Sequence, residues 1–235
     1  MVRTTPFFII GNWKSNKTVE SAVQWFQDMQ TLWRKEPLDM TGVTVILCPS
    51  LLHLTTLTSL VKLFKLPLQF GAQDISANLS GAYTGDVSAE MLAPLVEYTL
   101  VGHSERRKYH AENETELQKK VDQAAKAGIE PVYCVQDAKM TIPDNCKIAA
   151  YEPVWAIGTG KAETAENAGQ VAGQLKARHP QITTIIYGGS VTHENVVSYV
   201  QTTSLDGVLP GGASLEAQKF YELIRQVAQT IRTPT

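Results

Sequence analysis

Residues 184–214 read TIIYGGSVTHENVVSYVQTTSLDGVLPGGAS, and this stretch contains the pattern that decides the fold. A short apolar run, Thr184–Tyr187, leads directly into a Gly-Gly pair, and a second run, Gly207–Leu209, is followed closely by another. Between them, Thr192 can cap a helix. Short apolar runs of this kind are typical of parallel strands that are covered on both faces. The stretch therefore predicts two parallel strands with a helical segment between them.

The same alternation continues outward from this stretch along the whole chain. The strand-like runs are Phe7–Ile10, Val43–Cys48, Leu68–Ala72, Tyr98–Val101, Pro131–Val135, Ile148–Tyr151, Thr184–Tyr187 and Gly207–Leu209. Helical signals lie between them, such as apolar residues three or four apart after Thr18, a capping box that begins at Asn113, and a possible cap at Thr164. Eight alternations without a linker predict an α/β fold, with one (β/α)8 barrel domain over residues 1–235.

The connection between the fifth and sixth strands departs from this pattern. Only residues 136–147 separate these two strands, and Pro143 lies among them. Because proline interrupts a helix, we expect the fifth helix to be shortened or absent, although the barrel still closes. Met140 and Ile142 are then the large apolar residues that are available to cover the outer faces of the two strands.

Composition narrows the class of protein. The chain has 235 residues, of which 43% are hydrophobic and 19% charged, and its net charge is −2. This balance is ordinary for a globular protein, and the lack of a basic patch argues against a nucleic-acid partner. No apolar run approaches the length of a membrane span, so we expect no membrane partner. The three cysteines lack paired spacing, which predicts reduced thiols and a cytoplasmic location.

Glycine-rich turns follow the last two strands, at the end of the barrel where such folds carry their chemistry. Glycines let the backbone approach a ligand closely, and Ser214 can begin a helix whose dipole favours an anion. Either Gly-Gly pair alone is more often ordinary turn punctuation. Two pairs at neighbouring strand ends, with a third glycine at Gly158, instead favour a phosphate site.

Three side chains at the strand ends suit acid–base chemistry. Glu152 follows an apolar strand, and Ile157 and Leu209 could exclude water and so make its carboxylate a better base. His103 begins a helix whose dipole would keep the ring neutral and able to donate a hydrogen bond. Lys14 could balance the charge of an enediolate and a phosphate. Each residue alone is more often an ion-pair partner, a core residue or a surface charge, so the hypothesis depends on their occurrence together.

Several strings taken together closely resemble the triosephosphate isomerase family. They are Gly11-Asn12-Trp13-Lys14, Gly81-Ala82-Tyr83-Thr84-Gly85, Val101 through Arg107, Tyr151 through Lys161, Tyr187-Gly188-Gly189-Ser190 and Gly211-Gly212-Ala213-Ser214. They occur in family order from the first strand to the last helix, so the resemblance covers essentially the whole chain. It implies a TIM barrel without cofactor or metal. The implied activity is that of an intramolecular oxidoreductase of glycolysis and gluconeogenesis, which interconverts dihydroxyacetone phosphate and D-glyceraldehyde 3-phosphate through an enediolate.

The resemblance also implies a role for each residue of the site. Glu152 would be the base that moves the carbon-bound proton, and His103 would be the electrophile that polarises the carbonyl. Asn12 and Lys14 would contact the substrate and complete the catalytic set. The phosphate would be held by the backbone N–H groups of Gly158, Ser190, Gly211 and Gly212.

A homodimer is the further expectation. The loop from Ala72 to Val87 is long for a connection that follows a strand, and long ordered loops usually have a binding role. By resemblance to the family, Thr84 in this loop would reach the neighbouring subunit beside Lys14 and His103.

Three departures from the family pattern keep other functions open. Pro210 stands where an aliphatic residue is usual, Cys134-Val135-Gln136-Asp137 stands where Cys-Ile-Gly-Glu is usual, and the fifth crossover is short. The short crossover and Pro210 support, as an alternative, a catalytically weak or inactive barrel scaffold. The phosphate loops alone would also suit another phosphosugar isomerase, because a phosphate site does not identify the sugar.

Overall fold

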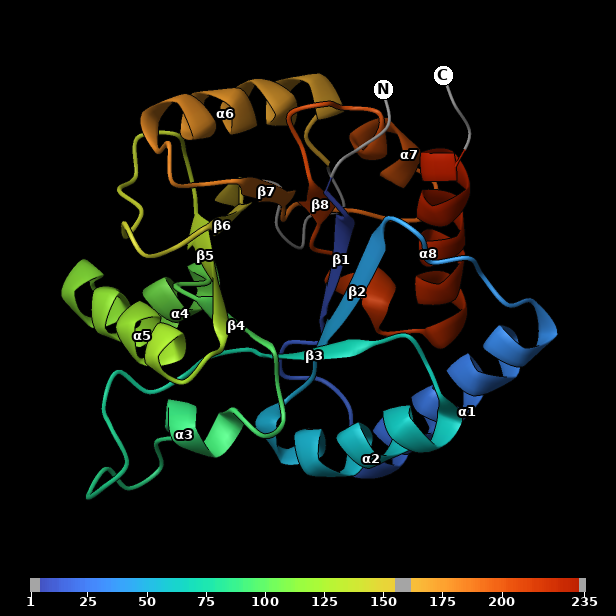
Figure 1. Cartoon of the computed structure of the whole chain (residues 1–235), viewed down its shortest axis with the longest axis horizontal. Coiled ribbons are helices and arrows are strands. Elements are labelled where there is room, and N and C mark those ends of the chain that lie inside the picture. The colour runs from blue at the N-terminus through green and yellow to red at the C-terminus, as the bar shows by residue number, and fades with distance from the viewer. Residues whose placement is uncertain (1–4, 155–161, 233–235) are drawn as a thin grey trace.

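The computed structural model describes residues 5–154 and 162–232, and its strands close into a barrel (Figure 1). The strands are β1 (Phe7–Asn12), β2 (Val43–Cys48), β3 (Gln69–Ala72), β4 (Tyr98–Val101), β5 (Glu130–Val135), β6 (Ile148–Tyr151), β7 (Thr184–Tyr187) and β8 (Gly207–Val208). All neighbouring pairs are parallel, and β1 closes the ring by pairing with β8. The predicted barrel is confirmed, and each predicted strand end lies within two residues of the observed one.

Helices surround the barrel on its outer side (Figure 1). They are α1 (Val19–Lys35), α2 (Leu54–Phe64), α3 (Ala89–Leu92), α4 (Ser104–Tyr109), α5 (Glu114–Lys126), α6 (Ala165–Arg178), α7 (Val196–Val200) and α8 (Ala217–Arg232), with 3-10 turns η1 (Leu51–His53) and η3 (Gly212–Ser214). Thr18 and the predicted caps Asn113 and Thr164 each accept a hydrogen bond from a backbone N–H in the first turn of α1, α5 and α6. Their polar side chains therefore fix where these helices begin.

Two predicted helix starts are wrong. The residue before α7 is Asn195, and its side chain accepts a hydrogen bond from the Thr192 N–H at 2.9 Å, so Thr192 belongs to a turn and does not cap the helix. Ser214 ends η3, where its hydroxyl donates to the Gly211 carbonyl at 2.6 Å, and α8 begins only at Ala217. The expected helix dipole at Ser214 is therefore not part of the site.

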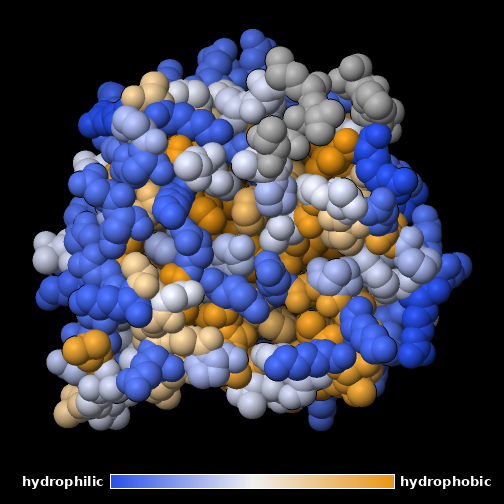
Figure 2. Space-filling model, viewed as in Figure 1, coloured by the Kyte–Doolittle hydropathy of each residue, from blue (hydrophilic) through white to orange (hydrophobic). Residues whose placement is uncertain are grey.

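Two apolar layers hold the barrel together. Successive strand residues point to opposite faces, so Ile10 packs inside the barrel whereas Ile9 packs outside under the helices. The inner set consists of Ile10, Ile46, Cys48, Leu100, Val132, Cys134, Ile148, Ala150, Ile186 and Leu209. Cys48 and Cys134 are thus small core residues. Figure 2 shows hydrophobic residues near the centre of the face viewed in Figure 1, surrounded by hydrophilic ones.

The connection between β5 and β6 contains no helix, as predicted. Residues 136–147 are all described, and Figure 1 shows them as a plain loop between α5 and α6. Ile142 and Cys146 are buried in the outer layer, and Met140 is partly buried beside them. The ring of His179 at the end of α6 contacts the Met140 carbonyl at 3.1 Å. The loop therefore covers the two strands with its own side chains.

A buried network of ion pairs ties the loop after β3 to α4 and α5. The Lys120 ammonium on α5 contacts Asp74 at 2.7 Å and Glu112 at 2.6 Å. The Arg106 guanidinium on α4 contacts the same two carboxylates. Burial raises the pKa of Asp74. Burial also opposes the ionisation of Glu112, but hydrogen bonds and charges from Lys120 and Arg106 lower its pKa below the ordinary value. The long loop therefore has a rigid base.

Candidate active site

Three of the predicted catalytic side chains come together at the carboxyl ends of the strands. Asn12 ends β1, His103 lies between β4 and α4, and Glu152 directly follows β6. Their exposed fractions are 3%, 5% and 1%, so water has little access to them. Because all strands are parallel, their carboxyl ends meet at one end of the barrel, which explains why residues so distant in the sequence converge.

His103 and Glu152 face each other. The Nε2 atom of His103 lies 3.2 Å from Oε1 of Glu152. On the other side of the ring, the Glu105 N–H donates a hydrogen bond to His103 Nδ1 at 3.2 Å. Since Nδ1 acts as an acceptor, the neutral ring carries its proton on Nε2. The imidazole is therefore oriented to donate a hydrogen bond into the same space that the Glu152 carboxylate faces.

The two oxygens of Glu152 have different surroundings. The Ser104 N–H donates to Oε2 at 3.0 Å, which fixes the carboxylate. Oε1 is buried, and no hydrogen bond to it is found among the described residues, although His103 Nε2 lies 3.2 Å away. Burial raises the pKa of the neighbouring Cys134 thiol well above its ordinary value, and the charge of Glu152 raises it further. One carboxylate oxygen is thus held in place, and the other can accept a proton.

Packing favours glycine at both positions of the turn after β7, independently of ligand binding. A Cβ atom on Gly188 would lie 3.0 Å from Cγ of Glu152, and one on Gly189 would lie 2.0 Å from the Tyr187 hydroxyl. A side chain at Gly188 would therefore press against Glu152, and one at Gly189 would displace the ring of Tyr187.

Lys14 is held by its backbone on one side of the site. Its φ angle is +52°, its N–H donates to Asn12 Oδ1 at 2.9 Å, and its carbonyl accepts from Ser50 at 3.1 Å and from Gln73 at 3.0 Å. Its ammonium pairs with Glu105 at 2.6 Å. The predicted cation is therefore present, but in this structure a carboxylate compensates its charge.

A cavity of about 640 Å³ lies beside these residues, although Asn12 and Glu152 are not among those that line it. Its wall includes Lys14, His103 and the turns that contain Ser190, Gly211 and Gly212. Cε of Lys14 lies 3.6 Å from the Cβ position of Gly211, so the cation and this turn line the same space. No hydrogen bond from the amides of Gly211 and Gly212 is found within residues 5–154 and 162–232. Gly158, also predicted to bind phosphate, and Ile157 lie outside the described residues.

Some residues of the site were assigned no role from the sequence. Glu105 both orients His103 and pairs with Lys14, and its position two residues after the histidine was the available signal. Glu163 is held by two tyrosines: its N–H donates to the Tyr187 hydroxyl at 3.0 Å, and the Tyr199 hydroxyl donates to its carbonyl at 2.6 Å. No local pattern indicates contacts of this kind.

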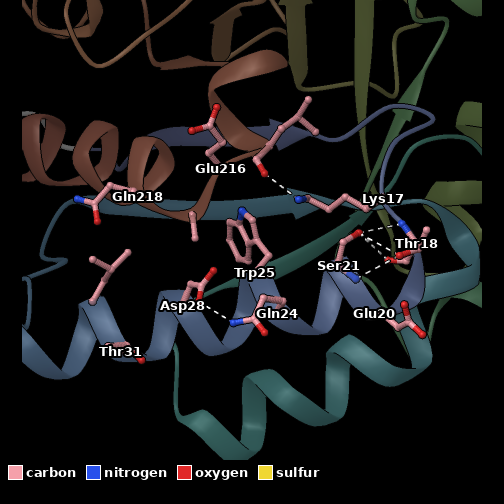
Figure 3. A pocket seen from close by; sticks show the side chains of 13 residues that line it. Lys17, Thr18, Glu20, Ser21, Gln24, Trp25, Asp28, Thr31, Glu216 and Gln218 are labelled. Atoms are coloured by element: carbon pink, nitrogen blue, oxygen red, sulfur yellow. Dashed lines mark hydrogen bonds between the residues drawn. The ribbon is translucent and has the colours of Figure 1, made fainter.

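A larger hollow, of about 900 Å³, lies outside the barrel (Figure 3). It opens between α1 and the start of α8 and is lined by side chains such as Lys17, Trp25 and Glu216. None of Asn12, Lys14, His103 and Glu152 lines it. The acid–base chemistry therefore belongs to the smaller cavity at the strand ends.

Two features are absent from the described residues. No cluster of three or more His, Cys, Asp or Glu side chains with a geometry for metal binding occurs in them. No helix among them has the length and apolar character needed to cross a bilayer.

Comparisons with known proteins agree on one family. The family described as triosephosphate isomerase matches residues 7–227. A triosephosphate isomerase of Leifsonia xyli is 37% identical over 92% of this chain and 95% of its own length. Similar relatives occur in Mesomycoplasma hyopneumoniae (37% identical, covering 92% of this chain and 97% of its own length) and Dehalococcoides mccartyi (34%, covering 94% and 96%). The similarity thus extends over nearly the full length of each sequence.

Proposed function

The chain belongs to the triosephosphate isomerase family, and from this we propose that Glu152 and His103 carry out its reaction. As a member of that family, it interconverts dihydroxyacetone phosphate and D-glyceraldehyde 3-phosphate, which is an intramolecular oxidation and reduction and a step of glycolysis. Its substrate is a phosphorylated triose. Neither the family match nor the relatives favour a different phosphosugar or an inactive scaffold.

Glu152 is the base in this proposal. Its Oε1 takes a proton from carbon 1 of dihydroxyacetone phosphate, the electrons of that bond form the carbon–carbon double bond of an enediolate, and the same oxygen returns a proton to carbon 2. The observation that carries this assignment is the buried Oε1, which has no hydrogen bond and lies 3.2 Å from His103 Nε2. A carboxylate that is already fixed and shielded from water is positioned to take the proton from a bound substrate.

His103 is the electrophile. Its Nε2–H donates to the carbonyl oxygen, so it stabilises the negative charge that develops there when Glu152 removes the proton. The hydrogen bond from the Glu105 N–H to Nδ1 supports a neutral ring in this role. Asn12 and Lys14 would contact the substrate. The Lys14 ammonium would then pair less closely with Glu105 and would balance the negative charges of the enediolate and the phosphate.

The phosphate is held by backbone amides in this proposal, those of Gly158, Ser190, Gly211 and Gly212. The position of Ser190, Gly211 and Gly212 on one wall of the cavity supports it. Pro210 is compatible with phosphate binding by the turn that follows it. Its carbonyl still accepts a hydrogen bond from the Asn12 N–H at 3.0 Å, so its link to β1 is kept. A proline lacks only the N–H group.

Turnover in D₂O tests the enediolate route. Conversion of D-glyceraldehyde 3-phosphate, followed by proton NMR, should give dihydroxyacetone phosphate with deuterium at carbon 1 in part of the product, because a proton on Glu152 exchanges with solvent. The Glu152→Gln variant should show no such incorporation at enzyme concentrations that complete the parent reaction. A product entirely free of deuterium at every stage would contradict the route.

We also propose that the chain forms a homodimer through the loop between β3 and α3. In Figure 1 this loop extends away from the barrel. Its side chains Leu79 and Tyr83 are 68% and 49% exposed, and exposed apolar side chains on an ordered loop favour an interface. The buried network at Asp74 gives the loop a rigid base. Thr84, also exposed, would reach the partner's site.

We further propose that the chain acts as one domain in the cytoplasm. Its three cysteines are buried free thiols, which suits a reducing compartment.

A further inference from the structure

Lys17 adopts a backbone conformation that is unusual for a residue with a side chain. Its φ angle is +74°, in the left-handed region that favours glycine. A non-glycine residue stays in this region only where the surrounding contacts compensate for the strain. Lys17 has such contacts at both ends: its carbonyl meets the His53 ring at 3.2 Å, and its ammonium donates to the Leu215 carbonyl at 2.7 Å.

The contact with Leu215 is one of three that join the loop after β1 and helix α1 to the end of η3. The indole N–H groups of Trp13 and Trp25 both donate to the Ser214 carbonyl, at 3.0 and 3.2 Å. The Lys17 ammonium also lies 5.0 Å from the centre of the Trp13 ring. Figure 3 shows Lys17 reaching across the hollow toward the chain before Glu216, above Trp25. The carbonyls of the consecutive residues Ser214 and Leu215 thus accept three hydrogen bonds.

The surroundings of Lys17 strengthen its bond to Leu215. Burial lowers the pKa of the Lys17 ammonium, whereas the charges of Asp28 and Glu216 oppose that change. A partly desolvated cation forms a stronger hydrogen bond to a carbonyl than a solvated one does. The bond therefore acts as a link between two loops that face the active-site cavity on their other side.

We propose that Lys17 is a positioning residue for phosphate binding: through Leu215 it holds η3 so that the amides of Gly211 and Gly212 face the cavity beside Lys14. The inference rests on the proposed phosphate site. Lys14 and Lys17 belong to the same loop, and Gly212 and Leu215 belong to the same turn. The bond between Lys17 and Leu215, which lies outside the barrel, therefore sets the distance between Lys14 and the glycine turn at the cavity. Lys17 itself does not line the active-site cavity.

Three variants of Lys17 separate positioning from general stability. Lys17→Met keeps the stem over Trp13 but loses the donor, Lys17→Arg keeps a cationic donor, and Lys17→Gly loses the donor and relieves the left-handed strain. Lys65 provides the matched control, because this exposed lysine at the end of α2 also has a positive φ of +52° and is far from the site in the sequence. The controls are Lys65→Met and Lys65→Gly.

The measurements are Tm, kcat and KM for D-glyceraldehyde 3-phosphate, and the inhibition constant of inorganic phosphate. Lys17→Met should raise KM and the inhibition constant together by about five- to tenfold and leave kcat within about twofold, as for loss of uniform binding. Lys17→Arg should return both constants most of the way to the parent values. Lys17→Gly should show the same binding defect without a loss in Tm, and Lys65→Gly should raise Tm without changing either constant.

Two results would overturn the inference, and they differ in what else they overturn. If folded Lys17→Met binds phosphate and substrate as the parent does, Lys17 has only a structural role and the phosphate site stands. If inorganic phosphate does not shift the amide NMR resonances of Gly211 and Gly212 in the parent protein, the proposed phosphate site is wrong and the inference fails with it.

Discussion

The imidazole Nε2 of His103 and the carboxylate Oε1 of Glu152 lie 3.2 Å apart, although they follow strands that are not neighbours in the barrel. Strand β5 separates β4 from β6, and its Cys134 side chain packs inside the barrel close enough to Glu152 for the two groups to interact. The curvature of the closed sheet, together with the Ser104 N–H that fixes Glu152, brings the acid and base into contact.

His103→Gln should lower kcat by about 100-fold or more, because an amide is a weaker proton donor and cannot shuttle protons between the two oxygens. KM should change much less. The matched control is His110→Gln, since His110 is exposed at the other end of α4 and should tolerate the change. Steady-state kinetics of both variants make the comparison. Equal kcat values for the two variants would exclude His103 as the electrophile.

Light scattering at micromolar concentration should give the mass of a dimer. Leu79→Asp should shift the protein toward monomer, because a charge on the protruding loop would be buried without a partner. Leu63→Asp is the control, as Leu63 is similarly exposed (71%, against 68% for Leu79) but lies on α2. A parent protein that is entirely monomeric would contradict the proposed interface.

Glu112→Gln should destabilise the fold by on the order of 3 kcal/mol at neutral pH, because the buried Lys120 and the partly buried Arg106 lose a charged partner. The pKa of Glu112 is lower in the folded state than its ordinary value of 4.5. A lowered carboxyl pKa contributes stability above the unfolded pKa, and this contribution is lost as pH falls through the folded pKa.

Urea unfolding at a series of pH values tests this prediction. The difference in unfolding free energy between parent and Glu112→Gln should be largest near pH 7 and should shrink below about pH 4.5. The exposed Glu20→Gln should stay within about 0.5 kcal/mol of the parent. A difference that is constant, or grows, toward acid pH would contradict the charge argument.

Hydrogen exchange should be fast across residues 136–147, relative to α5. The described hydrogen bonds from amides of this loop are short-range, such as Lys139 to Asp137 and Cys146 to Pro143, and none of them forms a helical ladder. Ile142 is buried, but we expect the backbone around it to open without unfolding of the barrel. Helix-like protection over several consecutive amides would show that this segment is not the loop described.

Most of the barrel could be predicted from the sequence, for a physical reason. Parallel strands buried on both faces are continuous apolar runs, so Val43–Cys48, Tyr98–Val101 and Thr184–Tyr187 were located to the residue. The residue at which a helix starts depends on which side chain forms a hydrogen bond with the free backbone N–H groups of the first turn. Ser214 has the side chain of a cap, but its hydroxyl and its carbonyl are taken by contacts with Gly211 and with two distant tryptophans.

The site was predictable only in part. Glycines, a histidine and a glutamate at strand ends indicated phosphate and acid–base chemistry. The pairing of Lys14 with Glu105 and the packing of Glu152 against Gly188 depend on contacts between segments far apart in the sequence, which no local pattern contains. The left-handed φ of Lys17 was unpredictable for the same reason, since its compensating contacts come from His53 and Leu215.

The turnover of Glu152→Gln tests the account most directly. The substitution keeps the size of the side chain and removes the base, so a coupled assay with D-glyceraldehyde 3-phosphate should show kcat lowered on the order of 1,000-fold. The inhibition constant of inorganic phosphate should stay within about twofold of the parent, because the glycine turns that bind it are unchanged. A folded Glu152→Gln variant with near-parent kcat would contradict the assignment of Glu152 as the base.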